Sequence, residues 1–147
     1  MSQKNKEVLG DLKEYSSWNK GKANDDKITL FDFATFIATP DMLFAISELF
    51  NPELFWFDGC CFIKEKFSKE AYGSWKSKGL EKTEIEKVMN HIHITSILQG
   101  EELELNMAES CSELIVYMWN KAFISKDVVG AVIGTELNDL AVTITSK

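Results

Sequence analysis

Apolar residues recur every three or four positions along most of the chain, which is the spacing that places side chains on one face of an α-helix. Glycine, proline or asparagine interrupts this pattern repeatedly, so the sequence predicts several short helices. The predicted helices cover residues 6–20, 30–37, 41–50, 68–78, 83–98 and 102–123.

The helix predicted over residues 102–123 has the clearest periodicity. Its apolar positions form one stripe, which we expect to face the core. The members of this stripe are Met107, Ala108, Cys111, Leu114, Ile115, Met118, Trp119 and Ala122. For the preceding helix, Thr83 and Glu86 have the spacing of a capping box, with Thr83 at the N-cap and the helix ending at Leu98.

Two segments have the composition of β-hairpins. In the first, apolar runs at 54–57 and 60–66 flank Asp58-Gly59, two residues that tolerate the positive φ of a tight turn. The second hairpin has β-branched or alternating runs at 127–134 and 139–145. The sequence therefore predicts an α+β fold, with an antiparallel sheet of about four strands from two hairpins packed against several helices.

The sequence predicts neither an interdomain linker nor a targeting segment. Only two prolines are present and the glycines are scattered, so we expect a single α+β domain over 1–147. The polar opening of the chain predicts no secretory signal, and no apolar run approaches the roughly 18 residues of a transmembrane helix. The three cysteines, two of them adjacent, indicate free thiols in a reducing compartment. We therefore expect a cytoplasmic protein with no membrane partner.

The net charge of the chain limits the kinds of molecule that it is expected to bind. The 147 residues carry 23 acidic and 16 basic side chains, all of the latter lysine, and the formal net charge is −7. An acidic chain without arginine lacks the basic surface and the bidentate guanidinium that nucleic-acid binding uses, so we expect no nucleic-acid partner. The negative excess lies in two lysine-free stretches, residues 28–59 and 98–120, which contain five acidic residues each.

The second lysine-free stretch lines one side of the predicted helix over 102–123 with polar positions spaced four, three and four apart. Like charges at this spacing destabilise a helix slightly. The stripe is therefore either an ordinary solvated face or a patch that meets a basic partner. The candidate residues of that patch, of which the first three also complement the helix dipole, are Glu101, Glu102, Glu104, Glu109 and Glu113.

The first lysine-free stretch contains eight aromatic residues. The simplest interpretation is that these side chains form part of the core, and the alternative is an exposed aromatic patch near residues 55–57. Trp56 alternates with Phe55 and Phe57 and so faces the other side of its strand. If that side is uncovered, Trp56 is a candidate anchor for a partner, and we place it with the neighbouring Asp58 among the candidate partner-binding residues.

His91 and His93 are the only arrangement that suggests a metal site. Residues two apart on the helix that is predicted to reach Leu98 differ by about 200°, so their imidazoles would point to opposite sides and could not share an ion. Cys60-Cys61 lacks the two-residue gap of a zinc or redox motif, and no nucleotide-binding or nucleophile-elbow motif is present. We therefore expect no catalytic residue, no metal and no cofactor.

The segments Pro52–Lys64 and Ile85–His93, followed by a long helix and a terminal hairpin, look like those of small uncharacterised bacterial proteins with no assigned activity. In size, acidity and lack of catalytic motifs, the chain also resembles the cytoplasmic immunity proteins that neutralise toxins of the contact-dependent or colicin type. This second likeness implies that acidic residues bind a basic toxin and cover or distort its active site.

These observations lead to three hypotheses of different classes. The first is a non-enzymatic protein-binding module, most concretely an immunity protein that neutralises a basic toxin through an acidic surface. The second is a small metal- or thiol-dependent enzyme that uses His91, His93 and a cysteine. The third is a structural protein that buries Trp56 in a homodimer.

Overall fold

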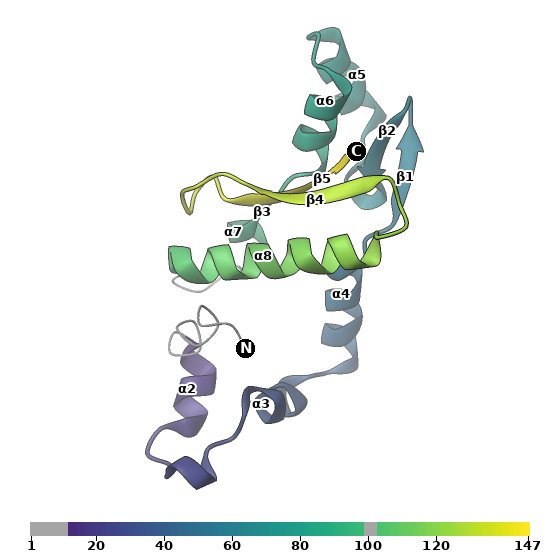
Figure 1. Cartoon of the computed structure of the whole chain (residues 1–147). Coiled ribbons are helices and arrows are strands. Elements are labelled where there is room, and N and C mark those ends of the chain that lie inside the picture. Colours follow the sequence, from purple (N-terminus) through teal and green to yellow (C-terminus); the bar gives the residue numbers. More distant parts are fainter. Residues whose placement is uncertain (1–11, 99–102) are drawn as a thin grey trace. The chain divides into compact units, whose positions relative to one another are not determined.

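The computed structural model describes residues 12–98 and 103–147. Contacts divide the chain into two compact units, Met1–Ile46 and Ser47–Lys147, which are described separately below. Helices and two small antiparallel sheets confirm the predicted α+β class (Figure 1). The prediction that the whole chain folds as one domain stays a prediction.

The first unit consists of short helices around one phenylalanine. The helices are α2 (Lys13–Asn19), the 3₁₀ turn η1 (Asn24–Asp26), α3 (Leu30–Ile37) and the first part of α4 (Pro40–Phe50). Phe33 is buried, and the rings of Tyr15 and Trp18 contact it edge-on at centroid distances of 5.7 and 5.4 Å. Phe33 is the one buried side chain among residues 12–46, so these four helical segments bury little apolar surface.

Side-chain hydrogen bonds fix the loop between α2 and α3. Asn19 accepts from the amide of Ile28 at 2.9 Å and donates to its carbonyl at 3.2 Å, and the Tyr15 hydroxyl donates to the same carbonyl at 3.0 Å. Thr29 and Asp32 then form a capping box at the start of α3. These bonds satisfy peptide groups that no helix or strand pairs.

The second unit begins with the first predicted hairpin, formed by β1 (Leu54–Phe57) and β2 (Cys60–Ile63). Asp58 and Gly59 have φ angles of 52° and 74°, the positive values that a two-residue turn requires. The predicted second strand over 60–66 was too long, because residues Lys64–Lys66 form the 3₁₀ turn η2.

Two helices, α5 (Lys69–Ser77) and α6 (Lys82–Asn90), follow the hairpin. Ser68 caps α5 as predicted, and its hydroxyl accepts from the amide of Ala71 at 3.2 Å. The predicted capping box at Thr83 is wrong, because Glu81 is the N-cap of α6 and pairs reciprocally with Glu84.

The helix predicted over 83–98 is also wrong at its end. It stops at Asn90, and Ile92–His93 forms the short strand β3, followed by the single turn α7 (Ile94–Ile97). β3 pairs with β5 (Ala141–Ser146), which pairs in turn with β4 (Val128–Ile133), so the second sheet has the order β3-β5-β4. The second predicted hairpin is thereby confirmed, with an additional strand beside it.

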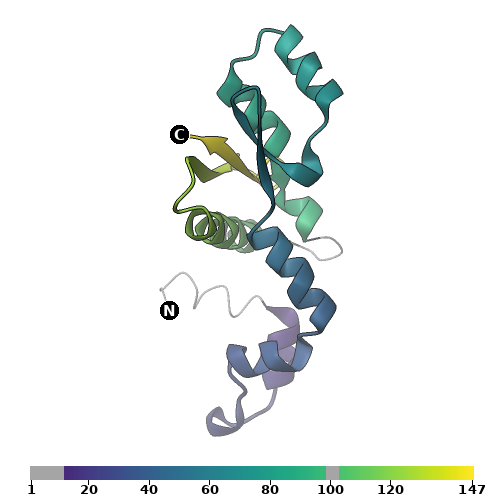
Figure 2. The same ribbon diagram turned by 90° about the vertical axis from the view of Figure 1, so that its right-hand side faces the viewer.

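The long predicted helix is α8 (Leu105–Ala122). It contacts β4 and β5, and Figure 2 shows it nearly end-on beside this sheet. Its buried face is formed by Ala108, Ser112, Ile115 and Trp119. The predicted stripe was therefore partly wrong, since Leu114 is 51% exposed. The pattern missed Ser112 because it is polar, although its hydroxyl donates to the carbonyl of Ala108 at 2.8 Å within the helix.

Two polar side chains of α6 join the two sheets. Glu86 accepts from the amide of Cys61 on β2 at 2.6 Å and from the amide of Ser146 on β5 at 3.0 Å. Asn90 accepts from the amide of Ile63 at 2.9 Å and donates to the carbonyls of Cys61 and Ile144, at 2.8 Å each. Both side chains are fully buried, so they replace the ladder of hydrogen bonds that β2 and β5 do not form with each other.

Apolar packing lies on both sides of the first hairpin. Cys61 and Ile63 join the larger core under α8, whereas Cys60 and Phe62 join a second cluster with Tyr72, Ile85 and Met89. In the described part of the chain, no single helix is long and apolar enough to cross a membrane, although the segments 24–37 and 40–50, bent by 96°, meet the length and hydropathy criteria as a pair.

Candidate functional site

The acidic candidates predicted from the sequence lie at and along α8. Glu101 and Glu102 lie outside the described residues. Glu104 is the N-cap of α8 and is exposed, Glu113 is exposed, and Glu109 is half-buried because it flanks the core face of the helix. A solvated acidic face and a partner-binding patch both fit this placement.

Trp56 and Asp58 lie on the first hairpin. Phe55 and Phe57 point into the second cluster, and Trp56 faces the other way, as the alternation predicts. Its side chain is 53% exposed, which the sequence left open. In Figure 1 the β1–β2 turn lies far from the first turns of α8, so the structure does not gather the predicted residues into one patch.

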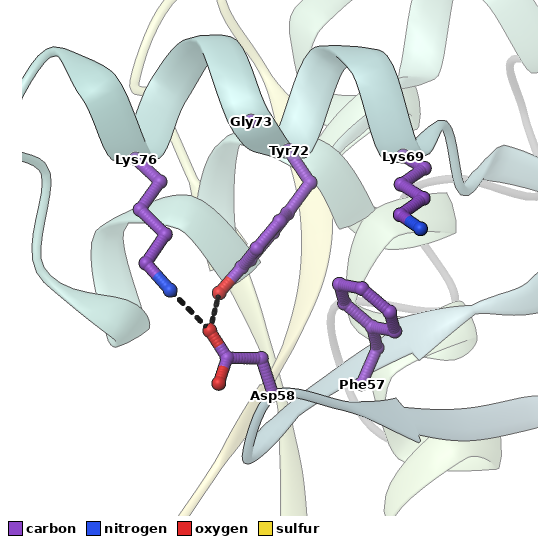
Figure 3. Close-up of a pocket in the computed structure, with 6 residues that line it drawn as sticks. All are labelled: Phe57, Asp58, Lys69, Tyr72, Gly73 and Lys76. Carbon is purple, nitrogen blue, oxygen red and sulfur yellow. Dashed lines mark hydrogen bonds and ion pairs between the residues drawn. The ribbon is translucent and has the colours of Figure 1, made fainter.

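A shallow pocket of about 520 Å³ opens beside the hairpin turn. It is lined by Phe57, Asp58, Lys69, Tyr72, Gly73 and Lys76. Figure 3 shows that Tyr72 and Lys76 of α5 both reach one oxygen of Asp58. The Tyr72 hydroxyl and the Lys76 Nζ donate to this oxygen at 2.6 Å each, so the charge of Asp58 is compensated locally.

The electrostatics of this pocket favour a structural role over acid–base chemistry. The hydrogen bonds from Lys76 and Tyr72 lower the pKa of Asp58 below its usual range. The hydrogen bond to Asp58, together with burial, raises the pKa of Tyr72 above its usual range. A carboxylate that stays ionised and a phenol that stays protonated at neutral pH are poor proton carriers there. Their contact instead attaches α5 to the turn.

Substituting Asp58 with asparagine is expected to remove an acid-sensitive contribution to stability. A carboxyl whose pKa is lowered in the folded state stabilises the fold above its usual pKa of 3.8, and this contribution disappears as the pH falls through the folded-state value. Thermal unfolding should therefore show a lower Tm for Asp58→Asn at pH 7, and the difference from the wild type should shrink below pH 3.8. Asp127→Asn, at an exposed position, is the control, and an equal pH dependence of both variants would contradict this role.

The two histidines lie closer together than the sequence predicted. Because the helix ends at Asn90, the rings of His91 and His93 meet edge-to-face with centroids 4.9 Å apart. The expectation that they point to opposite sides is therefore wrong. His91 Nδ1 lies 2.5 Å from the carbonyl oxygen of Val88, and His93 Nδ1 is buried and has no hydrogen-bond partner among residues 12–98 and 103–147. Among the described residues, no cluster of three potential ligands from His, Cys, Asp and Glu surrounds them.

The cysteines lack the surroundings of reactive thiols. Cys60 and Cys61 are fully buried, and Cys111 is half-buried. Burial is the main cause of a raised pKa for each thiol, and it raises the pKa of Cys61 to about 11. Reactive cysteines are partly exposed and have lowered pKa values. The three thiols are thus protonated at neutral pH.

A surface that the sequence did not predict lies on the first unit. The expectation that the aromatic residues of this stretch form the core is wrong for several of them. Phe31 and Phe44 are 78% and 75% exposed, and Phe36 and Leu43 are also mainly exposed. We call Phe31, Phe36, Leu43 and Phe44 the α3–α4 surface. Apart from Phe33, the aromatic side chains of α3 lie outside the core.

One signal in the sequence could have revealed this surface. Phe31 and Phe33 are two residues apart, so on a helix they point in nearly opposite directions and one short helix cannot bury both against the same neighbour. A helix that is apolar on all sides needs cover on more than one side. α3 comes close to this, because only Asp32 and Thr35 are polar in it, and Phe33 is its one buried residue.

Comparisons with protein families, with curated proteins and with solved structures find no match for this chain.

Proposed function

We propose that this chain is a non-enzymatic protein-binding module with a basic protein as its partner, most concretely a toxin that it neutralises as an immunity protein. The observation that carries the proposal is the α3–α4 surface, where four large apolar side chains are mainly exposed. The described residues of the second unit, 47–98 and 103–147, form an ordinary core and no arrangement with the features of a catalytic site.

The apolar component supplies the affinity. Burying one phenylalanine side chain contributes roughly 1.5–3 kcal/mol, and large exposed apolar patches on soluble proteins typically mark interaction sites. Aromatic side chains are common anchors of protein interfaces. Phe31 and Phe44 are the most exposed members of the surface and are its best candidates for such anchors.

The charge component selects the partner. Asp32 and Asp41 lie exposed in the first turns of α3 and α4, and residues 28–59 contain no lysine. The hydrogen bonds from Thr29 lower the pKa of Asp32, so this carboxylate stays charged at neutral pH. Exposed carboxylates on the same two helices as the α3–α4 surface attract lysine and arginine side chains of a partner and repel the carboxylates of a second copy.

The acidic residues of α8 are a second candidate contact for the same partner. Glu104 and Glu113 are exposed, and Glu109 lies beside them on the helix. Their participation stays a prediction from the sequence, and it can be separated experimentally from that of the α3–α4 surface because the two sets are on different units.

The proposal is tested by measuring binding to the product of the gene next to its own, where a toxin gene is expected, by isothermal titration calorimetry at low and high salt. We expect an affinity that falls with salt, since exposed charges are screened. The double variant Phe31→Lys/Phe44→Lys should bind at least about a hundredfold more weakly, because it replaces two anchors by charges that the partner repels.

Two further variants make the result specific. Ile124→Lys changes an equally exposed apolar residue outside the α3–α4 surface and should bind like the wild type. Glu109→Lys/Glu113→Lys measures the contribution of α8. Unchanged affinity in the phenylalanine variant would refute the α3–α4 surface, and absence of any association with that gene product would refute the assigned toxin partner.

A further inference from the structure

Strand β1 forms one edge of its sheet and has peptide groups that point outward. β1 pairs only with β2, in the register Leu54↔Ile63, Phe55↔Phe62, Trp56↔Cys61 and Phe57↔Cys60. On the opposite edge of β2, the amides of Cys61 and Ile63 donate to α6 and therefore not to β1. Directly opposite residues of an antiparallel pair share one hydrogen-bonding state. The N–H and C=O groups of Leu54 and Trp56 thus point away from β2.

Side chains cover the corresponding groups on other strand edges of this unit. Asn120 of α8 accepts from the amide of Gly130 on β4 at 2.9 Å and donates to its carbonyl at 3.3 Å. On β5, Asn90 and Glu86 hold the carbonyl of Ile144 and the amide of Ser146. Among the residues that the structure describes, no side chain caps the outward peptide groups of Leu54 and Trp56.

The charges next to this edge are already paired. Glu53, immediately before β1, forms an ion pair with Lys64 at 2.8 Å, and Asp58, immediately after it, forms one with Lys76 at 2.6 Å. An edge strand is usually protected by charged side chains that repel another strand. β1 instead consists of Leu54, Phe55, Trp56 and Phe57, with the indole of Trp56 exposed.

We propose that β1 is a homodimerisation edge that pairs antiparallel with β1 of a second copy. The strand is self-complementary about Phe55: when the two Phe55 residues face each other, Leu54 of one copy lies opposite Trp56 of the other. These are the residues with outward peptide groups, so both pairs exchange N–H···O=C bonds. Trp56 and Leu54 are on the same face of the strand, and each indole therefore covers the leucine of the other copy.

The pairing is weak because the strand is short. Two four-residue strands bury less than the roughly 1,200 Å² that stable interfaces reach. The dimer therefore dissociates on dilution, which distinguishes it from an obligate one. It uses residues of the second unit, whereas the α3–α4 surface belongs to the first, so different variants test this proposal and the proposed function.

Sedimentation equilibrium of the full chain, from micromolar to near-millimolar concentration, tests the proposal. The average mass of the wild type should rise with concentration from 16.7 kDa toward twice that value. Trp56→Lys removes the indole and adds a repelling charge, and it should stay at the monomer mass at every concentration. Trp56→Pro should do the same, because it removes an outward N–H without removing a bond to β2.

Val132→Lys is the matched control, because it places the same charge at an exposed apolar position of another edge strand, β4. It should associate like the wild type. Circular dichroism is used to check that each variant is folded. If Trp56→Pro is unfolded, the result for Trp56→Lys alone decides the test. A wild type that stays monomeric throughout, or a folded Trp56→Lys that associates like the wild type, would overturn the proposal.

Discussion

Replacing Asn90 with leucine is expected to lower the free energy of unfolding by about 4 kcal/mol. The two side chains have the same number of heavy atoms and branch at the same carbon, so the change opens no cavity. It removes the hydrogen-bond partners of three buried peptide groups, the amide of Ile63 and the carbonyls of Cys61 and Ile144. Each buried group without a partner costs about 1–3 kcal/mol. The sum is a large part of the stability of a domain this size.

Urea unfolding followed by circular dichroism measures this change. The midpoint should fall with little change in the slope, since the surface exposed on unfolding is nearly the same. Lys87→Leu is the control on the same helix, because Lys87 is exposed and the substitution should change the free energy by less than about 0.5 kcal/mol. A loss below about 1 kcal/mol for Asn90→Leu would show that water or a shifted strand satisfies the orphaned groups.

Replacing Trp119 with alanine is expected to cost a similar amount, about 4 kcal/mol. Trp119 is fully buried at the centre of the larger core, and its Nε1 donates to the carbonyl of Leu49 at 2.8 Å. The side chain also lies against β4, where a Cβ at Gly130 would be only 3.3 Å from its ring. Truncation therefore removes a large packed volume, a hydrogen bond and the contact between α8 and the sheet.

Two variants separate these contributions when unfolding is measured in the same way. Trp119→Phe keeps most of the packing and loses the indole N–H, so its cost should be about 1–2 kcal/mol. Trp56→Ala removes the same side chain from an exposed position and should cost less than about 1 kcal/mol. Equal losses for Trp119→Ala and Trp56→Ala would contradict the assigned position of Trp119 in the core.

Local signals in the sequence predicted much of the fold. Asp58-Gly59 identified a turn whose positive φ angles few other residue pairs adopt, and Ser68 identified the start of α5. Pro40 marked the beginning of α4. Each of these signals acts within a few residues, so no knowledge of the tertiary fold was needed to interpret it.

The incorrect predictions concern features that depend on distant partners. β3 has two residues, and its pairing with Val142 and Ala141 overrides the helical pattern that continues past Asn90. From the sequence alone, Ser112 and Glu86 look like surface residues. In the structure, Ser112 forms a hydrogen bond to Ala108 within α8, and Glu86 forms hydrogen bonds to β2 and β5. The spacing of apolar residues reports polarity and not burial, so the predicted buried face of α8 wrongly included Leu114.

The candidate site was predicted less well than the fold. The direction in which Trp56 points followed from strand alternation, and charge counting identified the stretch that contains the α3–α4 surface. Which of its aromatic residues are exposed depends on how few neighbours the first unit provides. That number is a property of the packing and cannot be obtained from the spacing of Phe31, Phe36 and Phe44 alone.

The hydrogen bonds from Glu86 and Asn90 of α6 to β5 also determine when the second unit can finish folding. Glu86 and Asn90 find partners at Ser146 and Ile144, 60 and 54 positions further along the chain. During synthesis, the hydrogen bonds of these two side chains to β5 cannot form before residues 144–146 have been made. The core of the second unit therefore closes only once residues 144–146 are available, and contacts between such distant segments form slowly. The interval before closure is when an unfinished chain depends most on the cell's folding machinery.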